Sequence, residues 1–502
     1  MLVNGYKGGG NMGSDLSQLY DPEIERVIYI LNALERVDGK ILLKDLAVQL
    51  EMNEKTVMRY GELIASFLKK SGVHTIEFAF DNHIVTWEVY DISDYRFFRN
   101  YIVQQCAIVQ LGVRLILGKR VNRIQFMEEF YLSESTLKRR LSSMRKLLKE
   151  YALNIKTSQG ELILIGDESI IRRLARDGLM NLYEYSPWPF ESVDERQIDL
   201  FIEKVFELSD FKYRRAMESE VIQTIKYDLA IQMTRVKLGY KVQLSERLQE
   251  NVRVIELIQQ ANILPLDVFR LSTTEQEYLI FQILAKDFFY MRPKGKQVLT
   301  LITSEELPLT TFLKSAMTAF SYEITALSIS YQNELYPFFL TIHLNDWLFP
   351  KWINSIHYRE LDIRVPQLMD NLANYLKELN AYYPNYIIGP IEVLQKNYGK
   401  LVAYLTNLSF QERKIKVGFI GARTILEIRT AENIVRESFS YLYNITFDYD
   451  APDIMIHLNQ YEHRVSKQVQ EPMIRCFVTS AFLVEDMSTI RQALFDFFNK
   501  NK

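Results

Sequence analysis

Basic side chains gather in one short stretch of this sequence, where their charge suits the binding of phosphate groups. Between Lys119 and Lys149 there are nine basic and three acidic residues, a local net charge of +6. Contacts from Lys and Arg to DNA phosphates supply affinity and a strong salt dependence, whereas the base sequence is read at the base edges. The alternative is a solvated helix face, which is what most basic runs are.

The chain as a whole is not basic. Its 502 residues include 60 Lys and Arg and 63 Asp and Glu, a net charge of −3, which excludes binding of nucleic acid through a uniformly basic surface. No apolar run approaches the ~18–20 residues of a membrane span. The start, MLVNGYKGGGNMGSDLSQ, lacks the apolar core of a secretory signal. We therefore expect a flexible tail over residues 1–20 and a cytoplasmic protein.

The residue types of metal and redox sites are sparse. Cys106 and Cys476 are too few for a disulfide framework or a four-cysteine zinc site. His457 and His463 lie close in sequence but lack a third ligand nearby. The sequence also contains no P-loop, no dinucleotide fingerprint, no nucleophile elbow and no zinc-protease helix. We expect neither an enzyme nor a bound cofactor or metal.

The first third of the chain repeats itself at an offset of 80 residues. The copies read LLKDLAVQLEMNEKTVMRYGELIASFLKK (42–70) and FMEEFYLSESTLKRRLSSMRKLLKE (126–150). In each copy a short amphipathic helix is followed by a residue, Asn53 or Ser133, whose side chain can cap a second helix. Helix, tight turn and capped helix form the helix-turn-helix pattern, whose second helix enters the DNA major groove. The predicted inward stripes of the second helices are Val57, Gly61, Ile64 and Leu68, and Leu137, Leu141, Met144 and Leu148.

A β-hairpin is predicted behind each helix-turn-helix. The alternating runs TIEFAF and HIVTWEVY surround Asp81-Asn82, and LNIKTS and ELILIG flank Gln159-Gly160. Both dipeptides suit tight turns that require positive φ. A hairpin in this place is a wing, so we predict winged helix-turn-helix domains over residues 21–91 and 92–166.

The residues expected to face DNA lie early in each capped helix or just upstream of it. Two copies with matching caps, stripes and wings favour DNA binding over a solvated face, and the charge supports the second copy more strongly. The candidates are Lys55, Thr56, Arg59 and Tyr60 in the first copy, and Lys119, Arg120, Arg123, Ser135, Thr136, Lys138, Arg139 and Arg140 in the second.

The remaining two thirds of the sequence predict helical domains followed by a small α/β domain. Long amphipathic stretches exceed one compact helical core, and the Pro, Gly and charge content of MRPKGKQ (291–297) marks a linker, so we predict helical domains over 167–293 and 294–408. From Lys414 the apolar run IKVGFIG, a helical stretch and three further strands predict a largely parallel sheet over 409–502. The fold class is multidomain and mainly α.

This order of parts resembles the Mga and AtxA family, large transcriptional regulators of Gram-positive bacteria that often govern virulence or colonisation genes. The resemblance implies that the helical pair are phosphotransferase-system regulation domains (PRDs) and that the terminal domain is similar to an enzyme IIB. LILIGDESIIRRL (162–174) is similar to the junction between a wing and the first PRD. The implied function is a DNA-binding transcriptional activator that the sugar phosphotransferase system modulates. The implied partners are double-stranded promoter DNA, the phosphocarrier protein, a second copy in a homodimer, and RNA polymerase.

The resemblance also implies a phosphorylation site. In PRDs a phospho-accepting His opens a helical motif that ends in Arg. TIHLNDWLFP places His343 as the acceptor but has Pro350 where Arg is expected, and KYDLAIQMTR keeps Arg235 but has Asp228 in place of His. A phosphorylated imidazole carries about two negative charges and can make or break ion pairs at a dimer interface. The alternative is a hydrogen-bonded His on a half-buried helix, which is the commoner case.

The terminal domain is not expected to transfer phosphate, because the loop after its first strand, 421–424, holds neither Cys nor His. Cys476 falls inside a predicted strand as a small buried hydrophobe. Two other functions stay open. One is an RNA-binding antiterminator, which also carries paired PRDs but begins with a small β-rich module. The other is a non-catalytic phosphotransferase-system partner whose helix-turn-helix copies serve protein contacts.

Overall fold

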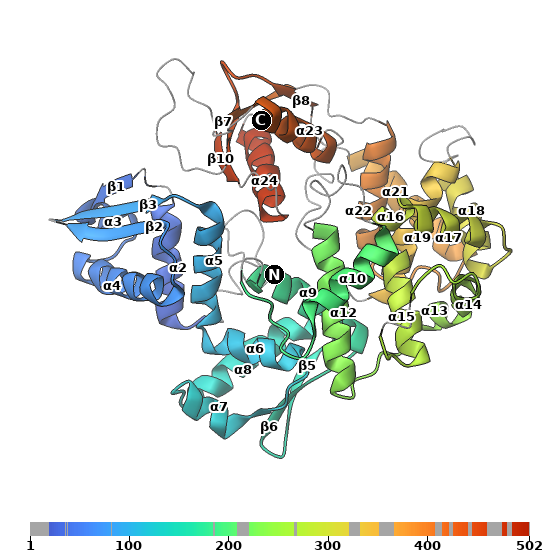
Figure 1. Ribbon diagram of the computed structural model, residues 1–502, viewed down its shortest axis with the longest axis horizontal. Helices are drawn as coiled ribbons and strands as arrows, with labels where there is room; N and C mark the ends of the chain where they lie inside the picture. The colour runs from blue at the N-terminus through green and yellow to red at the C-terminus, as the bar shows by residue number, and fades with distance from the viewer. Residues whose placement is uncertain are drawn as a thin grey trace.

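The computed structural model is mainly helical, with three small sheets. It describes residues 20–35, 37, 39–81, 83–183, 186–207, 220–265, 269–320, 332–350, 366–406, 414–420, 425–439, 444–458, 474–478 and 484–500. Figure 1 shows two lobes from the first third of the chain at the left and lower edge, a helical region at the centre and right, and an α/β lobe above. None of the described helices is long and apolar enough to cross a membrane.

The first lobe has the element order of a winged helix-turn-helix. Its three strands form an antiparallel sheet in the order β1-β3-β2, so the predicted hairpin gains a third strand. Asn53 caps α4 as predicted, since its Oδ1 accepts a hydrogen bond from the Thr56 N–H at 2.8 Å. Asn82, half of the predicted turn, lies outside the described residues. The elements are α2 (Pro22–Leu34), β1 (Gly39–Leu42), α3 (Leu43–Gln49), α4 (Glu54–Ser71), β2 (Ile76–Asp81) and β3 (Ile84–Val89).

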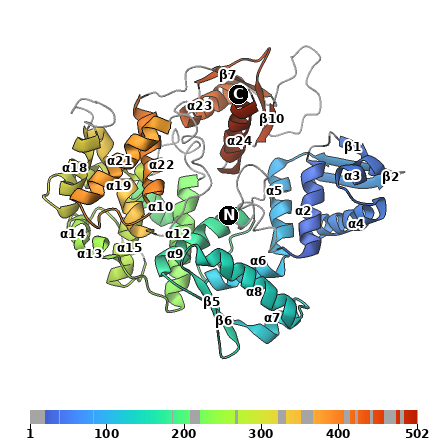
Figure 2. The same cartoon turned by 180° about the vertical axis from the view of Figure 1, so that it is seen from behind.

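The second lobe repeats this order after a connecting helix, α5 (Ile92–Gln104), which contacts α2, α4, α6 and α9. Its sheet has the equivalent order β4-β6-β5. The turn between β5 and β6 has positive φ at both Gln159 (51°) and Gly160 (79°), which confirms the prediction for this dipeptide. The same lobe is seen from behind in Figure 2. Its elements are α6 (Ala107–Ile116), β4 (Val121–Asn122), α7 (Arg123–Glu129), α8 (Glu134–Lys149), β5 (Asn154–Ser158) and β6 (Glu161–Ile165).

Between residues 167 and 406 the described chain is helical. The helices pack in pairs and small groups, including α9 on α12, α15 on α19 and α21 on α22. They are α9 (Glu168–Tyr183), α10 (Glu195–Phe206), α12 (Glu220–Lys237), α13 (Glu246–Glu250), α14 (Val252–Gln260), α15 (Thr273–Leu284), α16 (Asp287–Tyr290), α17 (Pro293–Thr303), α18 (Pro308–Phe320), α19 (Gln332–Leu348), α21 (Pro366–Tyr382) and α22 (Ile391–Thr406).

The segment 291–297 is not an extended linker, which corrects the expectation from its composition. Pro293 opens α17, where proline is favoured because the first helical N–H has no partner within the helix. Gly295 lies within the first turn of α17, and a Cβ there would stand 1.8 Å from the Phe289 carbonyl oxygen. Glycine therefore lets α17 pack directly against α16.

The last lobe is the predicted α/β unit. Its four strands are all parallel, in the order β10-β9-β7-β8. Cys476 is buried in β10, as expected of a small hydrophobe, whereas the loop 421–424 and His463 lie outside the described residues. The elements are β7 (Lys414–Ile420), α23 (Ile425–Phe439), β8 (Asn444–Phe447), β9 (Ile454–Leu458), β10 (Ile474–Val478) and α24 (Val484–Lys500).

Candidate nucleic-acid interface

The two helix-turn-helix units match in backbone geometry at the predicted offset of 80. The turn residue between the helices is left-handed in both, Glu51 with φ 53° and Tyr131 with φ 50°. The next N–H closes the turn in both: Met52 donates to the Ala47 carbonyl at 2.9 Å, and Leu132 donates to the Met127 carbonyl at 2.8 Å. The pattern of buried and exposed residues is also identical over 51–60 and 131–140. The repeat is therefore a repeat of structure.

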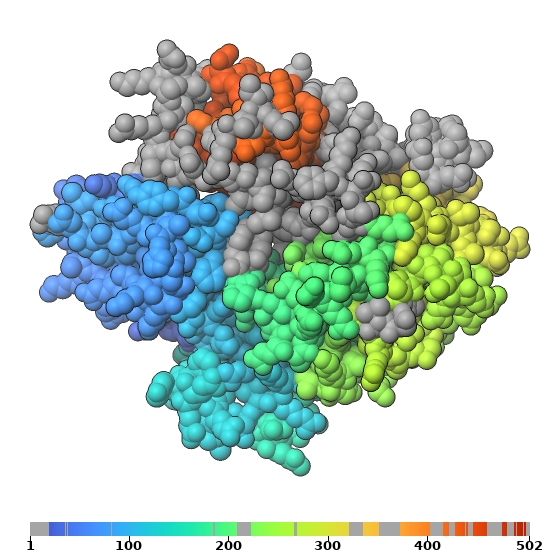
Figure 3. All heavy atoms as spheres, in the orientation of Figure 1, coloured from blue at the N-terminus to red at the C-terminus, as the bar shows by residue number. Residues whose placement is uncertain are grey.

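Helix α8 presents a polar face outward because its apolar stripe holds the opposite face against the lobe. Leu137 and Leu141 are buried, and Arg145 Nε donates to the Ile155 carbonyl of β5 at 2.9 Å, which fixes the helix to the wing. The exposed residues of the first two turns include three of the predicted DNA contacts, namely Ser135, Lys138 and Arg139. Figure 3 shows this lobe projecting from the lower edge of the molecule.

Surface carboxylates hold some of the basic residues in place. Glu134 lies 3.3 Å from Arg123 and 3.1 Å from Lys138, and the hydrogen bond from Lys138, together with the charges of both cations, lowers the pKa of Glu134. Arg120 lies 3.8 Å from Glu161, whereas Arg139 has no carboxylate partner within the described part of the chain. Exposed pairs of this kind contribute little to stability, so phosphates can displace them at low cost.

Two predicted DNA contacts are wrong because their side chains are buried. Tyr60 is 8% exposed, and its hydroxyl accepts a hydrogen bond from Arg59 Nη2 at 2.8 Å while the guanidinium lies over the ring. Arg140 is 7% exposed and forms an ion pair with Asp21. Both occupy the same position of the repeat, three residues after the first member of the inward stripe, Val57 or Leu137. Helical periodicity places that position on the inner face, a signal that the polar head groups of Tyr60 and Arg140 concealed.

Asp21 joins the start of the first lobe to the second. Its Oδ2 accepts a hydrogen bond at 3.0 Å from the N–H of Ala107, the first residue of α6, while its Oδ1 pairs with Arg140. Cys106, the N-cap residue of α6, makes no side-chain cap. Asp21 therefore supplies the acceptor that the N-terminus of α6 requires, and Arg140 has a structural role.

The first unit is less suited to phosphate than the second. Lys55 and Arg59 are exposed and Thr56 is half-buried. The window 39–69, equivalent to 119–149, contains five basic and four acidic residues, compared with nine and three. The second unit therefore carries most of the charge that duplex DNA would attract.

The predicted phosphorylation site, His343, lies deep in the helical region. His343 in α19 is 0% exposed, its Nε2 is 2.7 Å from the Tyr398 hydroxyl, and the Phe312 ring packs edge-on against it. Burial lowers the pKa of His343 to about 3, so the ring is neutral. A phosphoryl donor cannot reach the ring in this conformation, and phosphorylation there stays a prediction.

Asp228 in α12 is also buried, but it is fully paired. Its carboxylate lies 3.3 Å from Arg176 and 3.1 Å from Lys286. Burial alone would raise the pKa of Asp228, but the charges of Arg176, Lys286 and Arg173 outweigh burial and hold the pKa below its usual value. The negative charge of Asp228 is thus neutralised by neighbouring cations.

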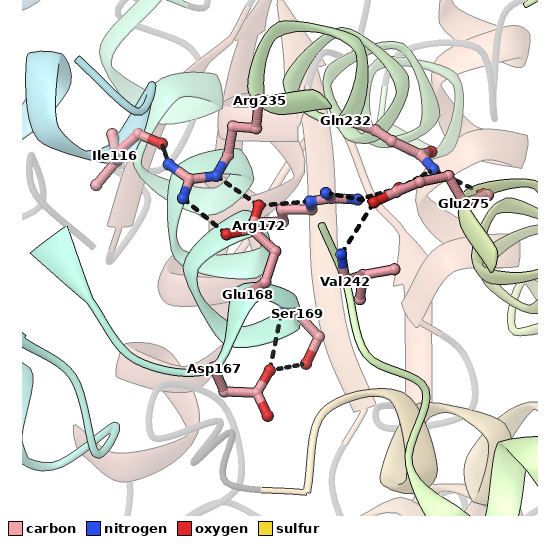
Figure 4. Close-up of polar contacts among 9 residues, drawn as sticks. All are labelled: Ile116, Asp167, Glu168, Ser169, Arg172, Gln232, Arg235, Val242 and Glu275. Atoms are coloured by element: carbon pink, nitrogen blue, oxygen red, sulfur yellow. Dashed lines mark hydrogen bonds and ion pairs between the residues drawn. The ribbon is translucent and has the colours of Figure 1, made fainter. Parts of the chain in front are cut away.

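A buried ionic network, which the sequence did not reveal, joins the helical region to the second lobe (Figure 4). Glu168 Oε1 accepts from Arg172 Nε at 2.8 Å and from Arg235 Nε at 2.6 Å, and Glu168 Oε2 accepts from Arg235 Nη2 at 2.7 Å. Arg172 pairs in turn with Glu275 at 2.6 and 2.9 Å. The only local signal was the spacing of four residues between Glu168 and Arg172, which is equally typical of an exposed helix pair.

The comparison with known families agrees with this geometry. Residues 93–175 match the family model of the Mga helix-turn-helix domain, a range that begins in α5, includes the whole second helix-turn-helix and its wing, and ends within α9. No curated protein matches the chain. Within residues 93–175 the chain is thus similar to the helix-turn-helix domain of the Mga regulators.

Proposed function

We propose that this protein regulates transcription by binding duplex DNA through α8 of the second lobe, with α4 of the first lobe making a weaker second contact. The observation that carries the proposal is the exposed face of Ser135, Lys138 and Arg139 on the first two turns of α8, within the matched domain. In helix-turn-helix proteins the N-terminal residues of the second helix contact base edges in the major groove.

The basic residues divide into two groups by position. Lys119 and Arg120 lie in the turn before β4 and Arg123 opens α7, so they flank the recognition helix and suit the sugar-phosphate backbone. Lys138 and Arg139 lie on the recognition helix itself, as do their equivalents in α4, Met58 and Arg59. Phosphate contacts give affinity and register, and contacts from the helix give sequence selection.

The test is duplex binding by the full chain at two salt concentrations. We expect Lys138→Ala with Arg139→Ala to weaken binding by about 30-fold or more and to lower the salt slope, because each lost base or phosphate contact costs ~1–3 kcal/mol. Lys314→Ala with Lys377→Ala removes the same charge from exposed positions on α18 and α21 and should leave binding unchanged. Equal binding by both double variants would contradict the proposal. Tighter binding to structured RNA would favour an antiterminator, and no nucleic-acid binding would favour a protein-contact role.

We further propose that phosphorylation in the helical region regulates this binding, and that the protein acts as an activator in a homodimer. The support is the order of the domains and the motif around His343. Joining two DNA-binding units makes the second contact intramolecular, so a change in dimer population would change occupancy without new base contacts. Phosphoryl transfer to His343 requires the packing of α18, α19 and α22 to open around the ring.

A further inference from the structure

The C-terminal ends of two helices, α6 and α12, meet where the second lobe joins the helical region. Both ends have the same hydrogen-bond pattern with a left-handed glycine. Gly118 (φ 89°) follows α6, and the Lys119 N–H bonds the Arg114 carbonyl; Gly239 (φ 87°) follows α12, and the Tyr240 N–H bonds the Arg235 carbonyl. Each end leaves backbone carbonyls without a partner inside its own helix.

Side chains of α12 and its cap satisfy the carbonyls of α6. Arg235 Nη1 donates to the carbonyl of Ile116, the last residue of α6, at 2.7 Å. The Tyr240 hydroxyl donates to the Gly118 carbonyl at 3.1 Å, and the Tyr240 ring lies so close that a Cβ on Gly118 would stand 2.8 Å from it. Two helix C-termini repel each other through their dipoles, so a guanidinium between them is favourable.

Arg235 is itself fixed from behind. It is 1% exposed, stacks on the Tyr240 ring at 4.3 Å, and is held by both oxygens of Glu168 in the bidentate geometry of a strong pair. Glu168 also bonds Arg172, which binds Glu275 on α15. The end of α6 is thus connected to three helices of the helical region.

The turn held in this way is the one that carries the proposed phosphate contacts. Lys119 directly follows Gly118, Arg120 follows Lys119, and both side chains are exposed. We propose that Arg235 and Tyr240 are positioning residues for DNA binding: they fix the Gly118 turn and thereby set where Lys119 and Arg120 meet the DNA backbone. This inference rests on the proposed function and adds the point at which the helical region controls the DNA-binding surface.

Tyr240→Phe in the full chain tests it, because this change removes the hydroxyl and keeps the ring. We expect duplex affinity to fall by about two- to tenfold, as for the loss of one hydrogen bond, with a smaller salt slope and no added effect when Lys119 and Arg120 are already Ala. Tyr290→Phe is the matched control, since the Tyr290 hydroxyl also donates to a backbone carbonyl, that of Leu284 at 2.8 Å, away from the turn. Arg235→Lys keeps the charge but not the fork and should weaken binding further.

The possible outcomes distinguish failure of the positioning role from failure of the proposed function. If the wild-type chain binds duplex DNA and Tyr240→Phe binds it with the same affinity, the positioning role is overturned but the proposed function is not. An equal loss in the Lys119→Ala, Arg120→Ala background also overturns it, because the effect would then not pass through those two residues. Absence of salt-dependent duplex binding by the wild-type chain overturns the proposed function and this inference with it.

Discussion

The ring of His343 is enclosed by aromatic side chains, and burial is the cause of its lowered pKa. Phe312 lies edge-on at 4.7 Å between ring centroids, and Tyr398 provides the one hydrogen bond found for the ring, at Nε2. A buried neutral group of this kind resists protonation, since the charged form would lose its hydration without gaining a partner. The stability of the helical region therefore depends on pH through this residue.

We expect acid to destabilise the protein through His343. In the unfolded chain His343 binds a proton below about pH 6.5, whereas in the folded chain burial lowers its pKa to about 3. The stabilising contribution is therefore complete above pH 6.5 and is lost as the pH falls toward 3. Between pH 7 and pH 5 the titration of His343 should lower the free energy of unfolding by about 2 kcal/mol. Denaturant unfolding across that range should show a flatter pH dependence for His343→Gln than for wild type, while the exposed His74→Gln retains the wild-type slope. Equal slopes for all three would show that the ring titrates normally.

At the scale of the elements, local signals in the sequence predicted the helix caps. The features that depend on long-range contacts were not predicted. Asn53 and Ser133 cap their helices as predicted, because a cap depends on residues within one turn. Strands β1 and β4 were missed, since four and two residues are too few to show an alternating pattern. The pairing of Arg235 with Glu168, 67 residues away, depends on how α9 packs on α12 and leaves no local pattern.

Two helical glycines should respond to alanine in opposite directions. At Gly295 in α17 a Cβ would meet the Phe289 carbonyl oxygen at 1.8 Å and the Tyr290 Cα at 2.8 Å, so α16 and α17 must separate, at a cost of about 2–3 kcal/mol. At Gly112 in α6 the nearest atom is the Met144 methyl at 3.7 Å, so alanine should raise stability by up to ~1 kcal/mol through helix propensity. Thermal unfolding of the two variants should show a lower Tm for Gly295→Ala and a higher Tm for Gly112→Ala than for the wild-type chain. A neutral Gly295→Ala would mean that the contact between α16 and α17 is not required.

At the scale of the whole molecule, polar contacts join each lobe to a neighbour. Arg96 of α5 bonds Asp486 at 2.9 Å and Thr489 at 3.1 Å, both on α24 of the α/β lobe. Asn345 of α19 donates to the Ala285 carbonyl at 2.9 Å, which links α19 to the end of α15. The Asn345 contact, helix α15 and the Glu168 network form a continuous route from the helix that carries His343 to the end of α6. Such a route gives a change in the helical region a physical means of reaching the DNA-binding surface.

Phosphorylation of His343 is the change that this route would transmit to the DNA-binding surface. We expect the phosphocarrier protein to label the wild-type chain and His74→Ala alike, and His343→Ala not at all. Because the His343 Nε2 contacts the Tyr398 hydroxyl in a closed site, Tyr398→Phe should be labelled faster, the ring having lost the hydrogen bond that retains it. Labelled and unlabelled protein should then differ in duplex affinity, since about two added charges cannot remain buried without rearrangement. Unchanged labelling of His343→Ala would remove this residue from the mechanism, and labelling without any effect on DNA affinity would separate phosphorylation from DNA binding.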